Sequence, residues 1–483
     1  MPSRINLCDF MMKVSDEMFT KVLVANRGEI AVQIIRALHD MQISAVAVYS
    51  QADRESLFVK LADEAVCIGG PQPADSYLNM TQIISTAKLL GCQAIHPGYG
   101  FLSENATFAR LCQQCQITFI GPNADLIDLM GDKAHARAAM QANQVPVIPG
   151  SDGVLDSADQ AVQIAQKIGY PVLLKSAAGG GGKGIREVQT AAELPAAFEQ
   201  VQQEAKLSYG DAAVYLEKCI GQAKHIEMQV IADNFGEVVY LPERDCSLQR
   251  HHQKVIEESP CGMIDAKQRQ WLGQTVARAT RKLGYTNTGT FEFLMDQDHH
   301  FYFIEMNTRL QVEHTITEAV TGIELVKAQI RVAANQPLGF TQADVKLNGY
   351  AIECRLNAED PQHQFAPCPG KITALYLPAG SLGVRIDSGV IAGSVISPYY
   401  DAMIAKLIVS SQQRTTALAK MDRILSEMQI EGIKTNRQFL RQLLTQRAVQ
   451  AGMFTTTFIA EMRQKGDEAD VTSEVQNAQS EEP

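Results

Sequence analysis

The sequence has no long uninterrupted apolar run, and nowhere does it approach the roughly 18 residues that a membrane-spanning helix needs. Its first 19 residues also lack the apolar stretch of a secretory signal and contain three acidic side chains. Neither membrane insertion nor export is expected, and translation could start at Met11, Met12 or Met18.

An excess of positive charge is absent as well. The 43 lysines and arginines are outnumbered by 54 aspartates and glutamates, which gives a net charge of −11. An extended nucleic-acid-binding surface needs a basic excess, so nucleic acid is not an expected partner. Apolar residues make up 46% and charged residues 20% of the chain, as in an ordinary globular enzyme. Any anionic substrate must therefore be held by lysines and arginines gathered at one site.

A paired-cysteine metal site is also missing. Cys112 and Cys115 have CxxC spacing, but no second pair completes a tetrahedral zinc site, so we expect them to pack on one face of a helix. The ten cysteines are scattered along the chain. Without a secretory signal they are expected to be reduced thiols of a cytoplasmic protein.

What the sequence does contain is an alternation of strand and helix patterns near its start. The segment KVLVANRGEIAVQIIRALHDMQISAVAVYS joins two β-branched runs through apolar residues at helical spacing. It predicts a strand–helix–strand unit and a parallel sheet that continues to about residue 130. A compact α+β unit at about 150–220 is small enough to move as a lid, and largely β regions follow from about 225 and beyond 345. A length of 483 residues fits about three domains.

The segment AAGGGGKG, from Ala177 to Gly184, holds four consecutive glycines between two strand-like stretches. It matches G-x-G-x-x-G, but a dinucleotide fold needs a helix after this loop, and the Walker pattern needs a Lys-Ser or Lys-Thr pair. The remaining interpretation is a glycine hairpin whose backbone N–H groups cover phosphate oxygens. The alternative is a flexible surface hairpin without a ligand.

The most informative stretch is GTFEFLMDQDHHFYFIEMNTRLQVEH, which predicts two strands joined by a polar turn. Glu305 and Asn307 stand two apart on the second strand and share a face, and Glu292 on the first strand can lie opposite them. Two carboxylates and an amide oxygen on one face suit Mg²⁺ beside nucleotide phosphates. The alternative is that the acids pair with nearby lysines or arginines.

A basic and an acidic residue stand just beyond this hairpin, in the run Arg309, Gln311, Val312, Glu313 and His314. Next to a metal–nucleotide site, such a pair could bind a small anion and remove its proton.

Seven motifs resemble, in order and spacing, those of the biotin carboxylases of the ATP-grasp superfamily: ANRGEIA, HPGYGFLSEN, GDKAHA, ERDCSLQRHHQK, FIEMNTRLQVEH, ECRLNAED and SPYYDAMIAKL. The resemblance covers about residues 20–460 and is far more specific than the glycine loop. It implies an α/β and α+β multidomain fold: a Rossmann-like N-terminal domain at 20–130, an ATP-grasp domain at 131–335 with a mobile lid at about 150–220, and a β-rich C-terminal biotin carboxylase domain at 345–460. The acidic tail at 464–483 is expected to be disordered.

The resemblance also assigns roles to individual residues. The glycine hairpin would close over ATP as a flap, through Gly181 and Gly182. The other residues that would bind ATP are Lys133, Lys175, Glu217, Lys218, Ile220, His225 and His252. Mg²⁺ or Mn²⁺ would be held by Glu292, Glu305 and Asn307. Bicarbonate would lie among Lys254, Arg309, Gln311 and Val312, with Glu313 as its base, and Arg355 would stabilise the ureido oxygen of biotin.

Four positions depart from the family pattern. Thr315 stands where a proline is usual, and His251 stands where an arginine is usual. Ala178 shortens the glycine run by one, and Lys183 replaces a common arginine. None of these changes removes a catalytic side chain, although the two loop changes could alter the dynamics of the lid.

The implied activity is ATP-dependent carboxylation of biotin with bicarbonate, through carboxyphosphate. The sequence contains no biotin-attachment segment of the Met-Lys-Met type and no carboxyltransferase domain. We therefore expect a biotin carboxyl carrier protein and carboxyltransferase subunits as partners, and a homodimer. Acetyl-CoA is the expected final acceptor, in fatty acid (malonyl-CoA) synthesis, while propionyl-CoA, other acyl-CoAs and pyruvate stay open.

The sequence argues against two other functions. A different ATP-grasp carbon–nitrogen ligase would have no reason to carry RLQVEH together with ECRLNAED. A catalytically dead nucleotide-binding subunit would not be expected to keep Glu292, Glu305, Asn307, Arg309 and Glu313.

Overall fold

The computed structural model describes residues 18–177 and 184–464. Gly181 and Gly182 of the expected flap, and the tail from residue 465 onward, lie outside the described residues. Within the described ranges, no helix is both long and apolar enough to cross a membrane.

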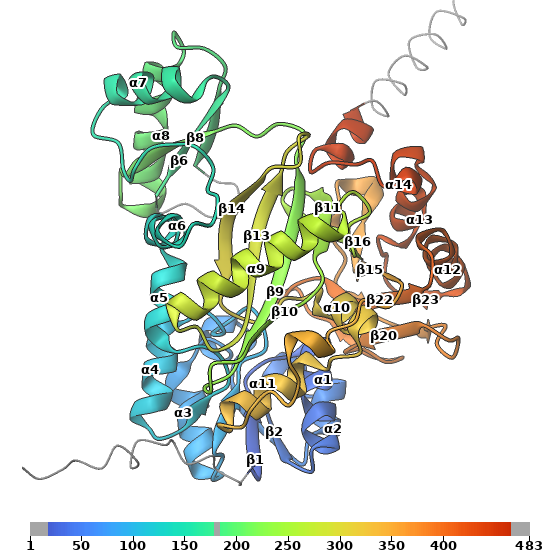
Figure 1. Cartoon of the computed structure of the whole chain (residues 1–483). Coiled ribbons are helices and arrows are strands. Elements are labelled where there is room, and N and C mark those ends of the chain that lie inside the picture. Colours follow the sequence, from blue (N-terminus) through green and yellow to red (C-terminus); the bar gives the residue numbers. More distant parts are fainter. Residues whose placement is uncertain (1–17, 178–183, 465–483) are drawn as a thin grey trace, which may run out of the picture.

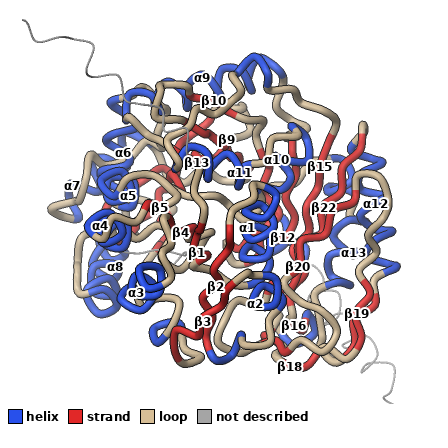
Figure 2. Tube along the Cα trace, turned by 90° about the horizontal axis from the view of Figure 1, so that it is seen from below, coloured by secondary structure: helices blue, strands red, loops and turns tan. Residues whose placement is uncertain are grey.

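The N-terminal part is a parallel sheet with helices on both sides (Figure 2). Its strands run in the order β3-β2-β1-β4-β5 and are β1 (Lys21–Val24), β2 (Ser44–Ser50), β3 (Glu64–Gly69), β4 (Ala94–His96) and β5 (Thr118–Phe119). The helices are α1 (Gly28–Asp40), α2 (Leu57–Leu61), α3 (Met80–Leu89), α4 (Ala106–Gln114) and α5 (Ala124–Gly131). Cys112 is buried in the apolar core on α4, and Cys115 follows the last turn of that helix.

The strand order places the binding crevice of this sheet. The chain moves from β1 to β2 on one side and from β4 to β5 on the other, so the loops after β1 and β4 diverge. Parallel sheets bind ligands at such a point, beyond the carboxyl ends of the strands. Asn26 fixes the two loops together, because its side-chain amide donates to the carbonyl oxygens of Pro97 (2.7 Å) and Tyr99 (2.8 Å).

A small α/β unit projects from the molecule at the upper left of Figure 1. It consists of α7 (Ala158–Ile168), α8 (Leu194–Tyr209) and a three-stranded antiparallel sheet in the order β7-β6-β8, with β6 (Val172–Ser176), β7 (Ile185–Val188) and β8 (Val214–Lys218). Its apolar core is separate from the others, as in a structural unit of its own. A strand, not a helix, follows the glycine segment, which excludes the dinucleotide-binding loop.

The rest of the chain is built on one nine-stranded sheet. The path runs β14-β13-β9-β11-β12-β15-β22-β20, with β10 added beside β9. Its strands are β9 (Lys224–Ala232), β10 (Val238–Tyr240), β11 (Arg244–Arg250), β12 (Gln253–Ser259), β13 (Asn287–Met295), β14 (Phe301–Asn307), β15 (Tyr350–Asn357), β20 (Val384–Ser388) and β22 (Met403–Ser411). Because β12 pairs with β15, the central part and the C-terminal part of the chain share this sheet, which the sequence analysis did not anticipate.

Helices and short strands complete the structure. The helices are α6 (Lys133–Ala142), α9 (Ala266–Leu283), α10 (His314–Thr321), α11 (Leu325–Ala333), α12 (Arg414–Glu427), α13 (Arg437–Thr445) and α14 (Arg447–Ala451). The short strands are β16 (Glu359–Asp360), β17 (Ala366–Pro367), β18 (Gly370–Lys371), β19 (Ala374–Tyr376), β21 (Val395–Ile396) and β23 (Gln429–Glu431). In Figure 1, α9 crosses one face of the large sheet, and α12 and α13 lie beside the strands β15 and β22 at its other end.

Motifs from opposite ends of the chain meet beside the crevice. The phenol of Tyr400 donates to the carbonyl of Pro71 and also forms a hydrogen bond with the hydroxyl of Ser50, both at 2.6 Å, and the guanidinium of Arg27 lies 4.2 Å from the centre of its ring. A Cβ at Gly389 would lie 2.6 Å from the backbone of Gly28, so this close approach requires glycine. The C-terminal loops therefore close one wall of the crevice.

Candidate active site

A cavity of about 690 Å³ opens where the N-terminal loops, the large sheet and the C-terminal loops meet. It brings together ten of the residues that the sequence analysis singled out: His225, His252, Lys254, Glu292, Glu305, Asn307, Arg309, Gln311, Val312 and Arg355. Glu313 is completely buried and bonds to two of these side chains. The motifs thus converge on one site.

The β13–β14 hairpin carries the candidate metal ligands on one face. Glu292 stands opposite Glu305 in the antiparallel register, and a bulge follows directly after this pair. The side-chain amide of Asn307 donates to Glu292 (2.8 Å) and its oxygen accepts from Arg309 (2.9 Å). All three side chains line the large cavity.

The charges around Glu305 fit a small hard cation. Its side chain is 39% exposed, and among the described residues the nearest cationic atom is Nζ of Lys133 at 3.9 Å. Partial burial, and then the charge of Glu292, raise the pKa of Glu305. Two opposed carboxylates, of which Glu305 has so little compensation, stand beside an amide oxygen, and this donor set suits Mg²⁺ or Mn²⁺.

Lys254 already compensates the acids deeper in the site. From β12, its Nζ lies 3.1 Å from Glu292 and 2.7 Å from Glu313, and it also bonds to Glu227. Burial alone would lower the pKa of Lys254, but these carboxylates raise it well above its ordinary value. The lysine is therefore a fixed positive charge between the candidate metal ligands and Glu313.

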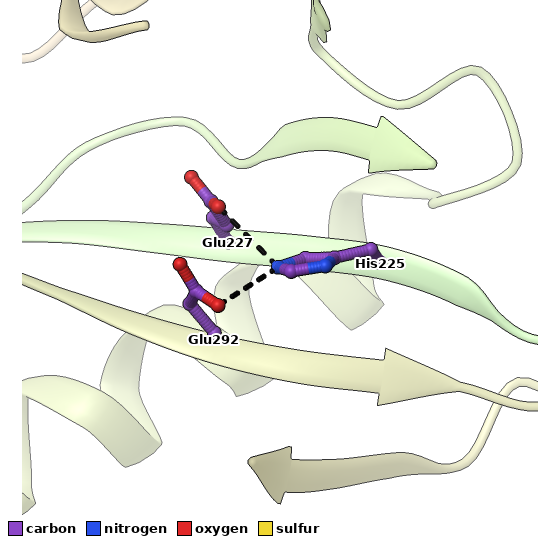
Figure 3. A group of neighbouring side chains, drawn as sticks. All are labelled: His225, Glu227 and Glu292. Atoms are coloured by element: carbon purple, nitrogen blue, oxygen red, sulfur yellow. Dashed lines mark ion pairs between the residues drawn. The ribbon is translucent and has the colours of Figure 1, made fainter. Parts of the chain in front are cut away.

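His225 lies between Glu227 and Glu292, with Nε2 at 3.3 Å and 3.1 Å from their oxygens (Figure 3). Burial would lower its pKa, but Glu292 and Glu227 outweigh it and raise the pKa of His225 to about 9. Sequence reasoning missed Glu227. The signal was available, because polar residues alternate at 225, 227 and 229 along β9, a strand whose residues are all buried.

Glu313 is held as a carboxylate by two cations. One oxygen lies 2.7 Å from Nζ of Lys254, and the other accepts from Arg355 at 2.8 Å. Burial and Glu227 act in the opposite direction, yet Lys254 and Arg355 keep the pKa of Glu313 below its usual value. An ionised carboxylate at the bottom of the site can accept a proton from a substrate.

Arg309 forms the edge of the same site. Its guanidinium donates to Glu104 (2.7 Å), Gln311 (3.0 Å) and Asn307 (2.9 Å), and Gln311 in turn donates to Glu292 (2.8 Å). Glu104 belongs to the HPGYGFLSEN motif, and its role as a partner of Arg309 was not predicted.

A second cavity of about 230 Å³, between the lid and α6, gathers Lys133, Lys175 and Glu217. Nζ of Lys175 lies 2.5 Å from Glu217. Lys218 and Ile220 line neither this cavity nor the large one. Instead, Lys218 donates to the carbonyls of Gly169 and Tyr170.

His251 and His252 form the two-residue turn between β11 and β12, with φ values of 50° and 61°. Hairpin turns of this length require positive φ at both positions. The turn carries His252 to the exposed rim of the large cavity.

Arg244 anchors the floor of the site and is completely buried. It donates to Glu227 at 3.1 Å, to Gln229 at 3.1 Å, to Thr317 at 3.0 Å and to Thr290 at 3.2 Å. It therefore ties three strands and α10 together.

Replacing Arg244 with methionine is expected to lower the free energy of unfolding by about 3–5 kcal/mol, because Glu227 loses a buried partner. The matched control is Arg423→Met, since Arg423 pairs with Glu427 at the exposed surface and should contribute less than about 1 kcal/mol. Denaturant unfolding of both variants measures the difference. Equal, small effects would show that Glu227 is satisfied without Arg244.

Comparisons with known proteins show what the whole chain is similar to. Family models of the biotin carboxylase N-terminal domain, the carbamoyl-phosphate synthase L chain ATP-binding domain and the biotin carboxylase C-terminal domain match residues 18–127, 132–341 and 353–461. Biotin carboxylase 1 of Bacillus subtilis is 51% identical over 443 residues, which cover 92% of this chain and 98% of that protein. A pyruvate carboxylase subunit of Methanothermobacter thermautotrophicus is 47% identical, with 96% of this chain and 94% of that protein covered.

A solved structure has the same fold. The biotin carboxylase domain dimer of Hydrogenobacter thermophilus 2-oxoglutarate carboxylase, in complex with MgADP, ADP and bicarbonate, is 47% identical with a TM-score of 0.87, and 92% of this chain and 98% of that one are covered. Identity of this extent, over nearly the whole of each chain and on the same three-domain architecture, shows that the chain belongs to the biotin carboxylase family.

Proposed function

We propose that this enzyme, which uses ATP and bicarbonate to carboxylate biotin, acts on biotin carried by a separate carrier protein and supplies the first half-reaction of acetyl-CoA carboxylase, in fatty acid synthesis. The observation that carries the chemistry is the double contact of Glu313, with Lys254 on one oxygen and Arg355 on the other. A base for bicarbonate and a cation for biotin thereby meet at one point.

The nucleotide lies between the lid and the large sheet in this proposal. Lys133 and Lys175 bind its phosphates, which explains why two lysines line the smaller cavity. A divalent cation, held by Glu292, Glu305 and Asn307, offsets the charge of the phosphates when it is bound. His252 lies near the phosphates, and the rest of the nucleotide is contacted by Glu217, Lys218, Ile220 and His225. Gly181 and Gly182 close over it.

Bicarbonate is held by Lys254, Arg309, Gln311 and Val312. Glu313 takes its proton, and a carbonate oxygen then attacks the γ-phosphoryl group as ADP leaves, which gives carboxyphosphate. Lys254 stabilises the charge that develops on the transferring group, because its carboxylate partners keep it a fixed cation in the site.

Biotin is carboxylated in the second step. Carboxyphosphate breaks down to CO₂ and phosphate, and the phosphate takes the ureido proton. Arg355 stabilises the enolate-like oxygen of biotin while the ureido nitrogen attacks CO₂. Closure of the lid keeps water away from both intermediates.

The chain is also proposed to form a homodimer, because the Hydrogenobacter thermophilus relative is a domain dimer. Analytical ultracentrifugation at micromolar concentration should give about twice the chain mass of 52.9 kDa. A species of single-chain mass at that concentration would contradict the proposal.

The carrier and the acceptor are tested together. The tagged chain should co-purify with a biotinylated polypeptide from its own cells, and the complex should form malonyl-CoA from acetyl-CoA, ATP and labelled bicarbonate. Propionyl-CoA, pyruvate and 2-oxoglutarate are run in parallel, because relatives at 47% identity are pyruvate and 2-oxoglutarate carboxylase subunits by name. Preferential labelling of one of these three would overturn the acetyl-CoA assignment and leave biotin carboxylation intact.

A further inference from the structure

Two completely buried glutamates are cross-strand neighbours beside Arg355. Glu257 on β12 and Glu353 on β15 are direct partners in the antiparallel register, and neither side chain is exposed. Oε2 of Glu257 and Oε1 of Glu353 each lack a hydrogen-bond partner within residues 18–177 and 184–464. Buried polar atoms are normally hydrogen-bonded, so this pair requires an explanation.

The other oxygen of each carboxylate is occupied. Oε1 of Glu257 accepts from Nε of Arg355 at 2.5 Å and forms an ion pair with Nη2, also at 2.5 Å, while Nη2 donates to Glu313 at 2.8 Å. Oε2 of Glu353 accepts from the hydroxyl of Thr315. A single proton on one of the two free oxygens would give the other its missing donor.

The pattern of contacts indicates which residue holds that proton. Glu257 has a charge-assisted hydrogen bond and a close ion pair with Arg355, so it is the better suited of the two to remain an anion. Glu353 has only a neutral hydroxyl as its partner, and a proton on its free oxygen can point to Glu257. Burial raises the pKa of Glu353 against the attraction of Lys406, and the charge of Glu257 adds to the rise.

The surrounding charges come from every element packed against the pair. They are Arg355 on the strand of Glu353, Lys254 on β12, Lys406 on β22, and Glu313 just before α10. Lys406 is itself shared with the carbonyl of Val312 (2.9 Å) and with Glu29 (3.5 Å). The cations are thus divided among several acceptors, and one neutral glutamate relieves the excess of negative charge.

We propose that Glu353 is a positioning residue that stays protonated at neutral pH and donates to Glu257, which then holds Arg355 in place for biotin. Thr315 has a part in this arrangement that the proline usual at its position could not have, since its hydroxyl binds the second oxygen of Glu353. The catalytic consequence rests on the proposed role of Arg355, but the protonation of Glu353 does not.

A loss of activity at alkaline pH follows from the raised pKa of Glu353. Glu353 is neutral below its raised pKa and ionises as the pH rises through it, which removes the donor and sets two anions against each other. Biotin-dependent turnover should fall over that range, whereas bicarbonate-dependent ATP cleavage should not. Removing the Thr315 hydroxyl takes a donor from the ionised form, so it should move the fall to higher pH.

Infrared difference spectroscopy tests the protonation itself. At pH 7 the wild type should show the C=O band of a protonated, water-shielded carboxyl group that Glu353→Gln lacks. The control is Glu461→Gln, because Glu461 also accepts from a threonine hydroxyl (Thr457, 2.6 Å) but is exposed. The absence of any such band in the wild type would overturn the proposal, whatever the role of Arg355.

Kinetics test the positioning role. Glu353→Gln keeps a donor and should retain biotin-dependent kcat/KM at pH 7 without the alkaline fall, whereas Glu353→Ala should lose about tenfold or more, the value of one charge-assisted hydrogen bond. Thr315→Val should shift the alkaline fall upward, and Thr321→Val, which removes a hydroxyl elsewhere on α10, should not. An alkaline limb unmoved in both Glu353→Gln and Thr315→Val would refute the positioning role, even if the infrared band is present.

Discussion

Replacing Glu305 with glutamine is expected to reduce bicarbonate-dependent ATP cleavage by about 100-fold or more, as for the loss of a major electrostatic stabiliser. Glu305 supplies one of the two facing carboxylates of the β13–β14 hairpin, and its nearest cation is 3.9 Å away. A neutral amide would bind a divalent cation far more weakly, so the KM for Mg²⁺ should rise together with the loss of turnover. Steady-state ADP release, titrated with Mg²⁺, measures both quantities.

The fold should survive this change. The side chain of Glu305 is 39% exposed, and its ion pair with Lys133 at 3.9 Å is long and itself partly exposed, so neutralising it costs the described part of the protein little stability. We expect an unfolding temperature within a few degrees of the wild type without nucleotide. The control is Glu427→Gln, an exposed glutamate that pairs with Arg423. Near-normal ATP cleavage by folded Glu305→Gln would remove this residue from the metal site.

The local geometry of the site was accessible from the sequence because strand alternation has a fixed period. Residues that stand two apart on a strand point to the same face, so Glu305 and Asn307 could be placed together. A hairpin could be expected to bring Glu292 opposite Glu305. The structure has that register. The same rule applies to β9, where polar residues at every second position place Glu227 on the face of His225. The sequence therefore contained the information needed to predict Glu227 as a site residue.

Long-range pairing was not accessible in this way. The β12–β15 contact joins segments about a hundred residues apart, and no local pattern specifies which strands become neighbours. Thr315 was recognised as a departure from the family pattern, but its bond to Glu353 depends on that pairing. The hydrogen bonds of Lys218 could not be predicted for the same reason. Its side chain donates to the carbonyls of Gly169 and Tyr170, which lie almost fifty residues earlier in the chain.

Replacing Arg355 with serine is expected to reduce biotin carboxylation by about 100- to 1,000-fold, while bicarbonate-dependent ATP cleavage falls less than about tenfold. The two steps separate because Glu313 has two cations: without Arg355 it keeps Lys254 at 2.7 Å and can still take a proton from bicarbonate. The guanidinium itself is the only group proposed to act on the ureido oxygen.

The matched variant is Arg355→Lys, which retains the positive charge but not the planar fork that contacts Glu257 and Glu313 together. It should recover part of the biotin-dependent rate and restore the stability that serine loses by leaving Glu257 without a cationic partner in the interior. Product analysis with free biotin, beside ADP release with bicarbonate alone, measures the two activities in one preparation. An equal loss of both in Arg355→Ser would mean that Arg355 serves bicarbonate or ATP and that the oxygen of biotin is stabilised by another donor.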